Sequence, residues 1–243
     1  MATHTNSIIA NILETLNNLY PSMQHAYIDH GLGDSGMIVT VIIPYNVSRG
    51  YLGEAVDSVK SQTYENVELI IEKGDCVWPV SANKAIRKCK GGLIKILSED
   101  DLLTPTSVES AVEYFSTNDA DFIHSNAINF HKNGREEYWN PSEQKYPGSP
   151  HPTLERNLEK NSIHGGTVTY RKKCFDERLF DETLWTGEEW EFHLWLQKSG
   201  YKLGYLNEFT TRCRRHPNQK SLGSQSRQKD RQKEFSRIRA KFK

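Results

Sequence analysis

The sequence lacks the features that mark membrane and secreted proteins. No apolar run approaches the roughly 18 residues that a membrane-spanning helix needs. The first residues carry neither the basic stretch nor the apolar core of a secretory signal. The chain is also poor in cysteine, and its four thiols are scattered without metal-finger or redox spacing at Cys76, Cys89, Cys174 and Cys213. These absences predict a cytoplasmic protein with reduced thiols, and the 36% hydrophobic and 26% charged residues indicate a globular chain.

The net charge at pH 7 is zero, but positive and negative residues are unevenly distributed along the chain. Residues 212–243 hold twelve Lys or Arg and two acids, so this segment carries +10 and the rest of the chain −10. We expect residues 222–243 to form a basic tail in which Phe235, Ile238 and Phe242 recur at helical spacing. Such a tail predicts peripheral contact with an anionic membrane or with nucleic acid. The alternative is a solvated or frayed C-terminal helix.

Ahead of this tail the chain divides into an appendage and a main domain. Residues 1–36 predict an appendage with a helix at 7–20 and a glycine-rich linker at 31–36, which packs either on the main domain or on another subunit. From residue 37 onward β-rich runs alternate with helical patterns, which predicts an α/β fold with a mostly parallel, doubly wound sheet and helices on both faces. The expected strands are 38–43, 67–71 and 93–97, and the expected helices are 52–59, 82–90 and 106–115. Pro44 is expected to stop the first strand, and residues 131–162 are expected to form a long loop of the kind that often serves as a lid.

The strongest single motif is an acidic segment that follows the buried run at 93–97. Glu99, Asp100 and Asp101 come directly after Ser98, at the end of an expected parallel strand, where α/β enzymes bind their ligands. Carboxylates at this edge suit a hard divalent cation that neutralises the phosphates of a nucleotide. Alternatively, the three acids sit in a solvated loop at the start of the next helix, where the helix dipole favours negative charge.

The acidic segment is one of several stretches, in order, that resemble the family 2 glycosyltransferases, which have a GT-A fold. The others lie at 40–46, 52–71, 82–86, 187–196 and 214–221. The resemblance covers roughly residues 37–221, with a nucleotide-sugar half at 37–105 and an acceptor half at 106–221. It implies transfer of a hexosyl or pentosyl unit from a nucleotide-diphosphate sugar to an acceptor hydroxyl, with inversion, assisted by Mn²⁺ or Mg²⁺. A UDP-sugar is the expected donor, with GDP- or dTDP-sugars as alternatives, and the acceptor is a glycan or another hydroxyl compound.

The resemblance assigns donor and metal roles to particular residues. The expected donor-binding residues are Pro44, Tyr45, Asn46, Glu72, Asn83, Glu99, Arg214 and Arg215. Asp100 is the expected metal ligand, with Glu99 and His216 beside it, whereas Asp101 is expected to cap the following turn. Two departures from the family are notable, because Ser98 replaces the first acid of its metal motif and residues 72–75 replace its paired Asp residues. If the resemblance is set aside, the end of the first strand is predicted to be a turn, and Asn83 and His216 are predicted to be exposed residues.

Catalysis and acceptor binding are assigned to the second half of the chain. The resemblance implies that Glu189 is the general base, with Glu191 as an alternative, and that His164, Gly165, Gly166 and Trp185 approach the acceptor. The sequence leaves simpler explanations open. Glu189 and Glu191 can be acids at a helix N-terminus, where the dipole favours them, and the two glycines can belong to a strand-entry turn. Trp185 and Trp190 can pack in the core. Two rival functions also remain, namely a catalytically silent nucleotide- or sugar-binding module and a transferase whose acceptor is nucleic acid or a membrane-bound glycan lipid.

Overall fold

The computed structural model describes residues 26–27, 36–47, 49–74, 77–143, 150–217, 219 and 225–243. The helix expected at residues 7–20 lies outside the described residues, as does nearly all of the linker. Within the described part of the chain, no helix is long and apolar enough to cross a membrane.

The first half of the sheet is built from three parallel strands, as the sequence predicted. β2 (Val39–Tyr45) lies between β3 (Val67–Lys73) and β4 (Leu93–Ile96), and the short β1 (Ala26–Tyr27) pairs antiparallel with the outer side of β3. Residues of β2 and β4 are buried on both faces, which is why they read as continuous apolar runs. Pro44 does not stop β2, because β4 pairs only with Val39–Ile42 and the strand continues alongside β3 alone.

The second half of the sheet is mixed, and it continues from the first half through the pairing of β4 with β8. β8 (Thr169–Arg171) runs antiparallel between β4 and β6 (Phe122–His131), and β9 (Leu203–Arg215) runs parallel to β6. Two shorter strands complete it: β5 (Leu102–Leu103) on β9 and β7 (Glu136–Trp139) on β6. The basic stretch at 212–215 is the end of β9, and it is held beside β6 by the parallel register.

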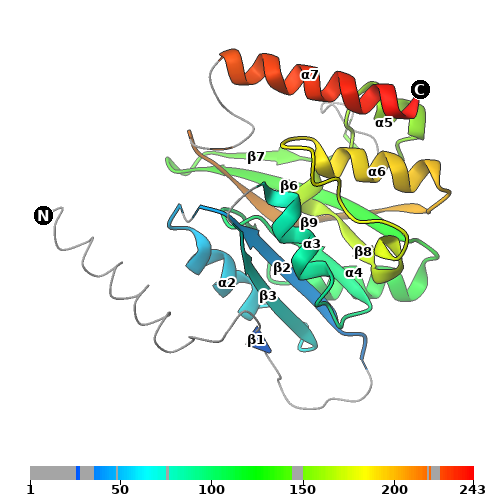
Figure 1. Ribbon diagram of the computed structural model, residues 1–243. Helices are drawn as coiled ribbons and strands as arrows, with labels where there is room; N and C mark the ends of the chain where they lie inside the picture. Colours follow the sequence, from blue (N-terminus) through cyan, green and yellow to red (C-terminus); the bar gives the residue numbers. More distant parts are fainter. Residues whose placement is uncertain are drawn as a thin grey trace, which may run out of the picture.

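Helices cover both faces of the sheet and enclose two apolar cores (Figure 1). α2 (Leu52–Lys60) and α4 (Ser107–Thr117) pack on one face, with Ala55, Val59, Val108 and Ala111 buried. α3 (Trp78–Ile86) and α6 (Glu188–Lys198) pack on the other face. α3 begins four residues earlier than predicted, since Pro79 in its first turn starts the helix rather than breaking it. The expected loop at 131–162 contains β7 and α5 (Leu154–Glu159), and its residues 144–149 lie outside the described part.

The basic C-terminal segment is neither frayed nor wholly solvated. It forms α7 (Gln225–Phe242), which lies across α6 and α5 at the top of the view in Figure 1. Ile238 is fully buried against Leu184, Trp190 and Leu194, and Phe235 packs beside it. The narrow apolar stripe seen in the sequence is thus an intramolecular contact surface, so the segment is not the solvated or frayed helix that the sequence left open.

Candidate active site

A cleft of about 1050 Å³ opens where the carboxyl ends of β2 and β4 meet the second half of the sheet. Its walls come from the acidic turn after β4, the 3₁₀ turn η1 (Gly165–Thr167), the start of α6, and α7. Of the predicted site residues, those that line it are Pro44, Tyr45, Asn46, Glu99, Asp100, His164, Gly165, Gly166, Trp185, Glu189 and Arg215. Residues from both predicted halves therefore share one cavity.

The backbone after β4 fixes the acidic residues on the cleft wall. Leu97 N–H donates to the Ile42 carbonyl over 2.8 Å, and Asp101 N–H then donates to the Ser98 carbonyl over 3.1 Å to form a turn. Arg49 Nη1 donates to Glu99 Oε1 over 3.0 Å, while Glu99 Oε2 is buried with no hydrogen-bond partner among the described residues. Burial raises the pKa of Glu99 despite the opposing effect of the Arg49 guanidinium.

Asp100 meets His216 from the far end of the chain. Asp100 Oδ2 lies 2.9 Å from His216 Nε2, and the imidazole packs at 5.3 Å from the ring of Tyr51. Arg214 Nε donates to the Asp100 carbonyl over 3.0 Å, and its guanidinium lies 4.3 Å from the Tyr51 ring centroid. His216 and Arg214 do not line the cleft themselves, so they contact Asp100 from outside the cavity.

Asp101 does not cap the following helix. The cap position of α4 is Thr106, which makes no side-chain cap hydrogen bond, whereas Asp101 Oδ1 accepts the backbone N–H of Arg214 over 2.8 Å. Burial, with the Asp100 carboxylate nearby, raises the pKa of Asp101 to about 8. The carboxyl group of Asp101 is consequently protonated at neutral pH.

The acidic turn offers part of a metal shell. No three His, Cys, Asp or Glu side chains in the described ranges form a ready metal site. The Asp100 carboxylate and the His216 imidazole are nevertheless in contact, and the buried Glu99 Oε2 is an oxygen donor without a partner. These groups fit a hard divalent ion that takes its remaining oxygens from a substrate.

Glu189 lies against a turn of two glycines on the opposite wall. A Cβ built on Gly165 would come within 2.5 Å of the Glu189 carboxyl carbon, so only glycine leaves room for this carboxylate. A Cβ on Gly166 would instead meet the His164 ring at 3.6 Å and Asp101 Oδ2 at 3.7 Å, which are ordinary contacts. The glycine turn therefore lies between Glu189 and the acidic turn, and Glu189 and Asp101 line the same cavity.

The predicted acceptor residues differ in their surroundings. Burial and the positive charge of Arg215 lower the pKa of His164 to about 4, so its ring is neutral at pH 7 and packs 5.5 Å from the ring of Trp139. Trp185 lines the cleft with the Arg227 guanidinium 5.9 Å from its ring centroid. Trp190 is almost wholly buried, and its indole N–H donates to the Asn157 carbonyl over 2.8 Å, which makes it mainly a core residue.

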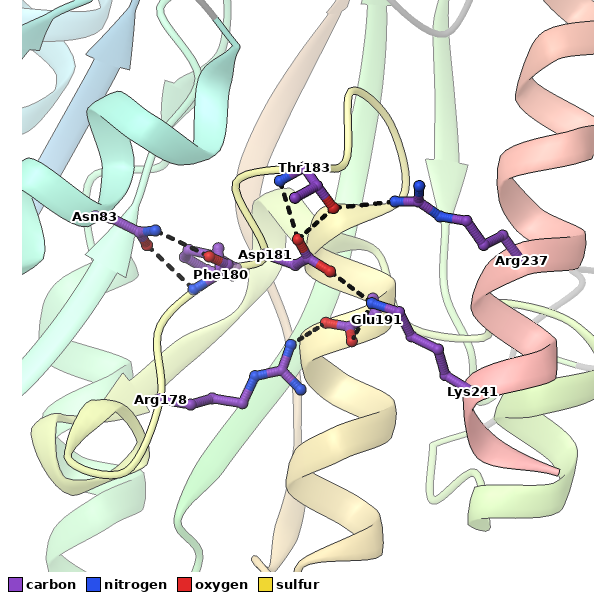
Figure 2. A network of polar contacts seen from close by, with 8 residues as sticks. All are labelled: Asn83, Arg178, Phe180, Asp181, Thr183, Glu191, Arg237 and Lys241. Atoms are coloured by element: carbon purple, nitrogen blue, oxygen red, sulfur yellow. Dashed lines mark hydrogen bonds and ion pairs between the residues drawn. The ribbon is translucent and has the colours of Figure 1, made fainter.

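Besides Arg214 and His216, three other predicted site residues do not line the cleft. Glu72 forms a 2.6 Å ion pair with Lys88, and Asn83 is fully buried, where its amide bonds to the backbone of Phe180 on both sides. Glu191 points to the other side of α6. There it forms ion pairs with Arg178 at 2.6 Å and Lys241 at 3.3 Å (Figure 2). Each of the three is already satisfied by other groups of the fold, because its helix or strand turns it away from the cavity.

The cleft also contains residues that the sequence did not single out. Among the polar and aromatic ones are Arg49, Asn129, Trp139, Lys160, Asn161, Arg227 and Arg231. Asn129 accepts a 2.5 Å hydrogen bond from Arg215 Nη2, which holds this guanidinium on the cavity wall. The spacing of Arg227 and Arg231, four residues apart on a helix, would have placed both on one face, but nothing in the sequence shows where that face docks.

Comparisons with known proteins show which proteins this chain is similar to. Residues 78–179 match the family model described as Glycosyl transferase family 2. An uncharacterized glycosyltransferase of Rickettsia bellii is 27% identical over 195 residues, covering 66% of this chain and 27% of the relative. One from Rickettsia felis is 25% identical over 197 residues, and these cover 66% of this chain and 31% of the relative. MJ1057 of Methanocaldococcus jannaschii is 22% identical over 211 residues, with 74% and 71% covered. The chain thus spans about a third or less of the length of the two Rickettsia relatives.

Solved structures show the same fold. S. aureus TarS residues 1–349 in complex with UDP superimposes with a TM-score of 0.56 at 16% identity, covering 74% of this chain and 61% of TarS. The complex of the same protein with UDP-GlcNAc gives a TM-score of 0.58 at 16% identity, covering 75% and 60%. The match over residues 78–179, the relatives and the shared architecture make this chain similar to the family 2 glycosyltransferases, and its fold is the GT-A fold.

Proposed function

We propose that the protein transfers a sugar from a nucleotide-diphosphate donor to an acceptor hydroxyl, with inversion and with help from a divalent metal. The observation that carries the proposal is the placement of Glu189 across a glycine turn from the acidic residues 99–101, in one cavity. A cavity of about 1050 Å³ is at the upper end of the usual range for ligand sites, which suits two substrates bound together.

The donor nucleotide fits the end of β2. Pro44, Tyr45 and Asn46 line the cleft there, beside Glu99. A UDP-sugar is the first donor to test, because TarS, which has the same fold, has been crystallised with UDP and with UDP-GlcNAc. GDP-, CDP- and dTDP-sugars, with hexosyl and pentosyl units, complete the panel.

The diphosphate is assigned to the space between Asp100 and Arg215. Asp100, with His216 and Glu99, would hold Mn²⁺ or Mg²⁺, which when bound neutralises negative charge on the leaving diphosphate. Arg215, fixed by its bond to Asn129, would pair with phosphate oxygens. Ser98 supplies no carboxylate at the first motif position, so these side chains must carry more of the binding.

Glu189 is the proposed base. Its carboxylate takes the proton of the acceptor hydroxyl while the acceptor oxygen forms a bond to the anomeric carbon. The bond from that carbon to the diphosphate oxygen breaks in the same step, and the diphosphate leaves with the electron pair. A single displacement of this kind inverts the anomeric configuration.

Nucleotide-dependent thermal stabilisation tests the donor site. UDP, GDP, CDP and dTDP are each added with and without Mn²⁺, since a ligand held at 100 times its Kd stabilises the native state by about 2.7 kcal/mol. We expect one nucleotide to raise Tm in a metal-dependent way, and Asp100→Asn to remove the metal dependence. If no nucleotide raises Tm under any condition, the donor assignment fails.

A matched pair of variants tests the base. Glu189→Gln should lower kcat by about 10²- to 10⁴-fold while the nucleotide-induced Tm shift persists. Glu191→Gln, two residues along the same helix but outside the cleft, should lower stability and leave turnover per folded molecule intact. Equal effects of the two changes on turnover would contradict the role of Glu189. Nucleotide binding without turnover in the unmodified protein, with every donor of the panel, would establish the silent-module alternative.

A further inference from the structure

The glycine turn η1 is closed by bonds among its own residues. The His164 carbonyl accepts the Thr167 N–H over 2.9 Å and the Thr167 hydroxyl over 2.7 Å. The Val168 N–H donates to the Gly165 carbonyl over 3.1 Å. These bonds fix the shape of the turn, but they do not fix where the turn lies relative to α6 and Glu189.

Three strands of the sheet fix its position. From β9, Thr211 Oγ1 donates to the Gly166 carbonyl over 2.9 Å. From β6, the Ser125 N–H donates to Thr167 Oγ1 over 3.2 Å. From β4, Lys95 Nζ donates to the Thr167 carbonyl over 3.3 Å. Because each strand supplies one of these bonds, the sheet determines where the turn lies.

Lys95 is an unusual residue for its place in the sheet. β4 is buried at every position, and Lys95 is 1% exposed between Ile94 and Ile96. Lysine is almost never buried to this degree without a partner. Burial lowers the pKa of Lys95 to about 8, so the fold holds this ammonium group at a cost. In the part of the chain that the structure describes, the Thr167 carbonyl is its one hydrogen-bond partner.

This lysine acts from behind the wall of the cleft. Lys95 does not line the cavity, so its ammonium group does not touch a bound substrate. Its partner Thr167 is the last residue of η1, and Gly165 is the first. A Cβ on Gly165 would lie 2.5 Å from the Glu189 carboxyl carbon, so a small shift of the turn changes the space that is left for this carboxylate.

We infer that Lys95 is a positioning residue for Glu189, because it holds the Thr167 carbonyl and thereby sets how closely the glycine turn approaches the carboxylate. The inference rests on the proposed function for the role of Glu189. An apolar side chain at position 95 would avoid the cost of burying a charge. It would also leave the Thr167 carbonyl without this bond and the turn free to shift.

Amide hydrogen exchange tests the contact without any substrate. Exchange of the Thr167 and Val168 N–H groups is measured by NMR in Lys95→Met and in Lys172→Met. Lys172 lies beyond the other end of β8 and also donates to a backbone carbonyl, that of Cys89, over 2.8 Å. We expect exchange at the turn to become about tenfold faster or more in Lys95→Met and to stay unchanged in Lys172→Met. No acceleration in Lys95→Met, or equal acceleration in both variants, would overturn the inference.

Turnover tests whether the turn positions the base. Lys95→Met should lower kcat by about tenfold or more, because a displaced carboxylate loses its reach to the acceptor hydroxyl. The Tm shift with nucleotide and Mn²⁺ should persist, and Lys172→Met should keep both properties. An unchanged kcat in Lys95→Met would overturn the inference. Loss of the nucleotide-induced shift in Lys95→Met would assign the lysine to the donor end and overturn it as well.

A second pair of variants reaches the turn from β9 and leaves the lysine in place. Thr211→Val removes the bond to the Gly166 carbonyl. Thr210→Val, one position earlier, removes a hydroxyl that contacts the hydroxyl groups of Ser125 and Thr211 rather than the turn. We expect Thr211→Val to lower kcat more than Thr210→Val. If Lys95→Met fails to fold, this pair decides, since equal kcat values would mean that the position of the turn does not matter.

Combination with Glu189→Gln separates the inference from the proposed function. If Lys95 acts through Glu189, Lys95→Met should not lower the residual kcat of Glu189→Gln any further. A further loss of about tenfold would show that the lysine acts elsewhere and would overturn the inference. If the unmodified protein turns over no donor, the proposed function fails, whereas faster exchange in Lys95→Met alone would still establish that Lys95 holds the turn.

Discussion

At the scale of single residues, the fit of Gly165 against Glu189 is the tightest constraint on the site. The Glu189 carboxyl group fills the space that a side chain at position 165 would need. We expect Gly165→Ala to displace this carboxylate and lower kcat by at least about tenfold, because a misplaced base loses its hydrogen-bond reach to the acceptor. Steady-state kinetics with the nucleotide-induced Tm shift measured in parallel would separate this loss from a loss of donor binding.

The neighbouring glycine supplies the control for that change. Gly166→Ala places its Cβ no closer than 3.6 Å to any neighbour, and neither glycine has a positive φ. It should therefore retain most of the activity. If Gly166→Ala is as damaging as Gly165→Ala, the turn responds to any added side chain, and the fit to Glu189 is not the cause.

The Asp100–His216 pair makes a second prediction at this scale. His216 Nε2 is positioned to bind a metal together with Asp100, or to orient its carboxylate. His216→Ala should raise the Mn²⁺ concentration that half-saturates the nucleotide-induced Tm shift by about 10- to 100-fold, a cost typical of residues that support a metal site. His131→Ala, near the surface at the end of β6, is the control. An unchanged Mn²⁺ requirement in His216→Ala would remove this histidine from the metal site.

At the scale of elements, α7 holds the turn that leads into α6. Gly187 has φ +75°, and a Cβ there would lie 2.8 Å from Ile238 Cδ1 and 3.0 Å from the Phe235 ring. Ile238→Ala should therefore cost about 2–5 kcal/mol of unfolding free energy, as is usual for a buried isoleucine. Urea denaturation would measure this cost, with the exposed Ser236→Ala, expected within about 0.5 kcal/mol of the parent, as the control. A cost below about 1 kcal/mol would mean that α7 is only loosely docked.

The ion pairs shown in Figure 2 connect α7 to the same region from the opposite side of α6. Glu191 is almost fully buried and is paired with Arg178 at 2.6 Å and with Lys241 at 3.3 Å. Arg178→Met should destabilise the fold by about 3 kcal/mol, because it removes the nearer partner of a buried charge, and Lys241→Met should cost less. Chemical denaturation of both variants in the Glu191→Gln background would check the cause, since most of the Arg178→Met cost should disappear there.

The elements that sequence patterns predicted best are those decided by local burial. The runs in β2, β3 and β4 are apolar because both faces are covered, so their existence and parallel arrangement followed from the sequence. β7, α5 and the end of β9 did not, since their residues are half-exposed and their structure depends on pairing or packing with distant segments. The stripe of α7 was visible, but its partner on α6 was not.

The contrast between local burial and packing against distant segments also explains which predicted residues line the cleft. The acids at 99–101 lie in the cleft because a strand end fixes them there, and Glu189 because it opens a helix at the cavity. Asn83 and Glu191 were predicted to reach the site but do not line the cleft. Neighbouring positions on a helix face different directions, and the sequence does not show which of them faces the cavity and which faces the core. Arg227 and Arg231 went unnoticed because only the tertiary docking of α7 turns them toward the cleft.

At the scale of the whole molecule, the two halves of the sheet form one cleft because β8 joins them antiparallel between β4 and β6. The same packing buries three histidine rings. Burial lowers the pKa of His124 and His164 to about 4 and that of His193 to about 3. All three rings are neutral in the folded protein over the range where an unfolded histidine, with a pKa of 6.5, takes up a proton.

These rings predict how stability depends on pH. Above pH 6.5 neither state is protonated at these rings, whereas between pH 6.5 and 4 the unfolded state binds up to three more protons, so acidification favours unfolding. Asp101 contributes to the free energy of unfolding with the opposite sign. Because its pKa is raised to about 8, the folded state holds a proton that the unfolded state lacks, and this offsets part of the stability lost through the histidines. The net result should be a decrease in unfolding free energy on the order of a few kcal/mol between pH 7 and pH 4.5, measurable by urea denaturation. His193→Gln keeps a hydrogen-bonding group for Tyr170 and should make the decrease shallower. A free energy of unfolding that is constant or rises over this interval would show that the buried rings do bind protons in the folded state.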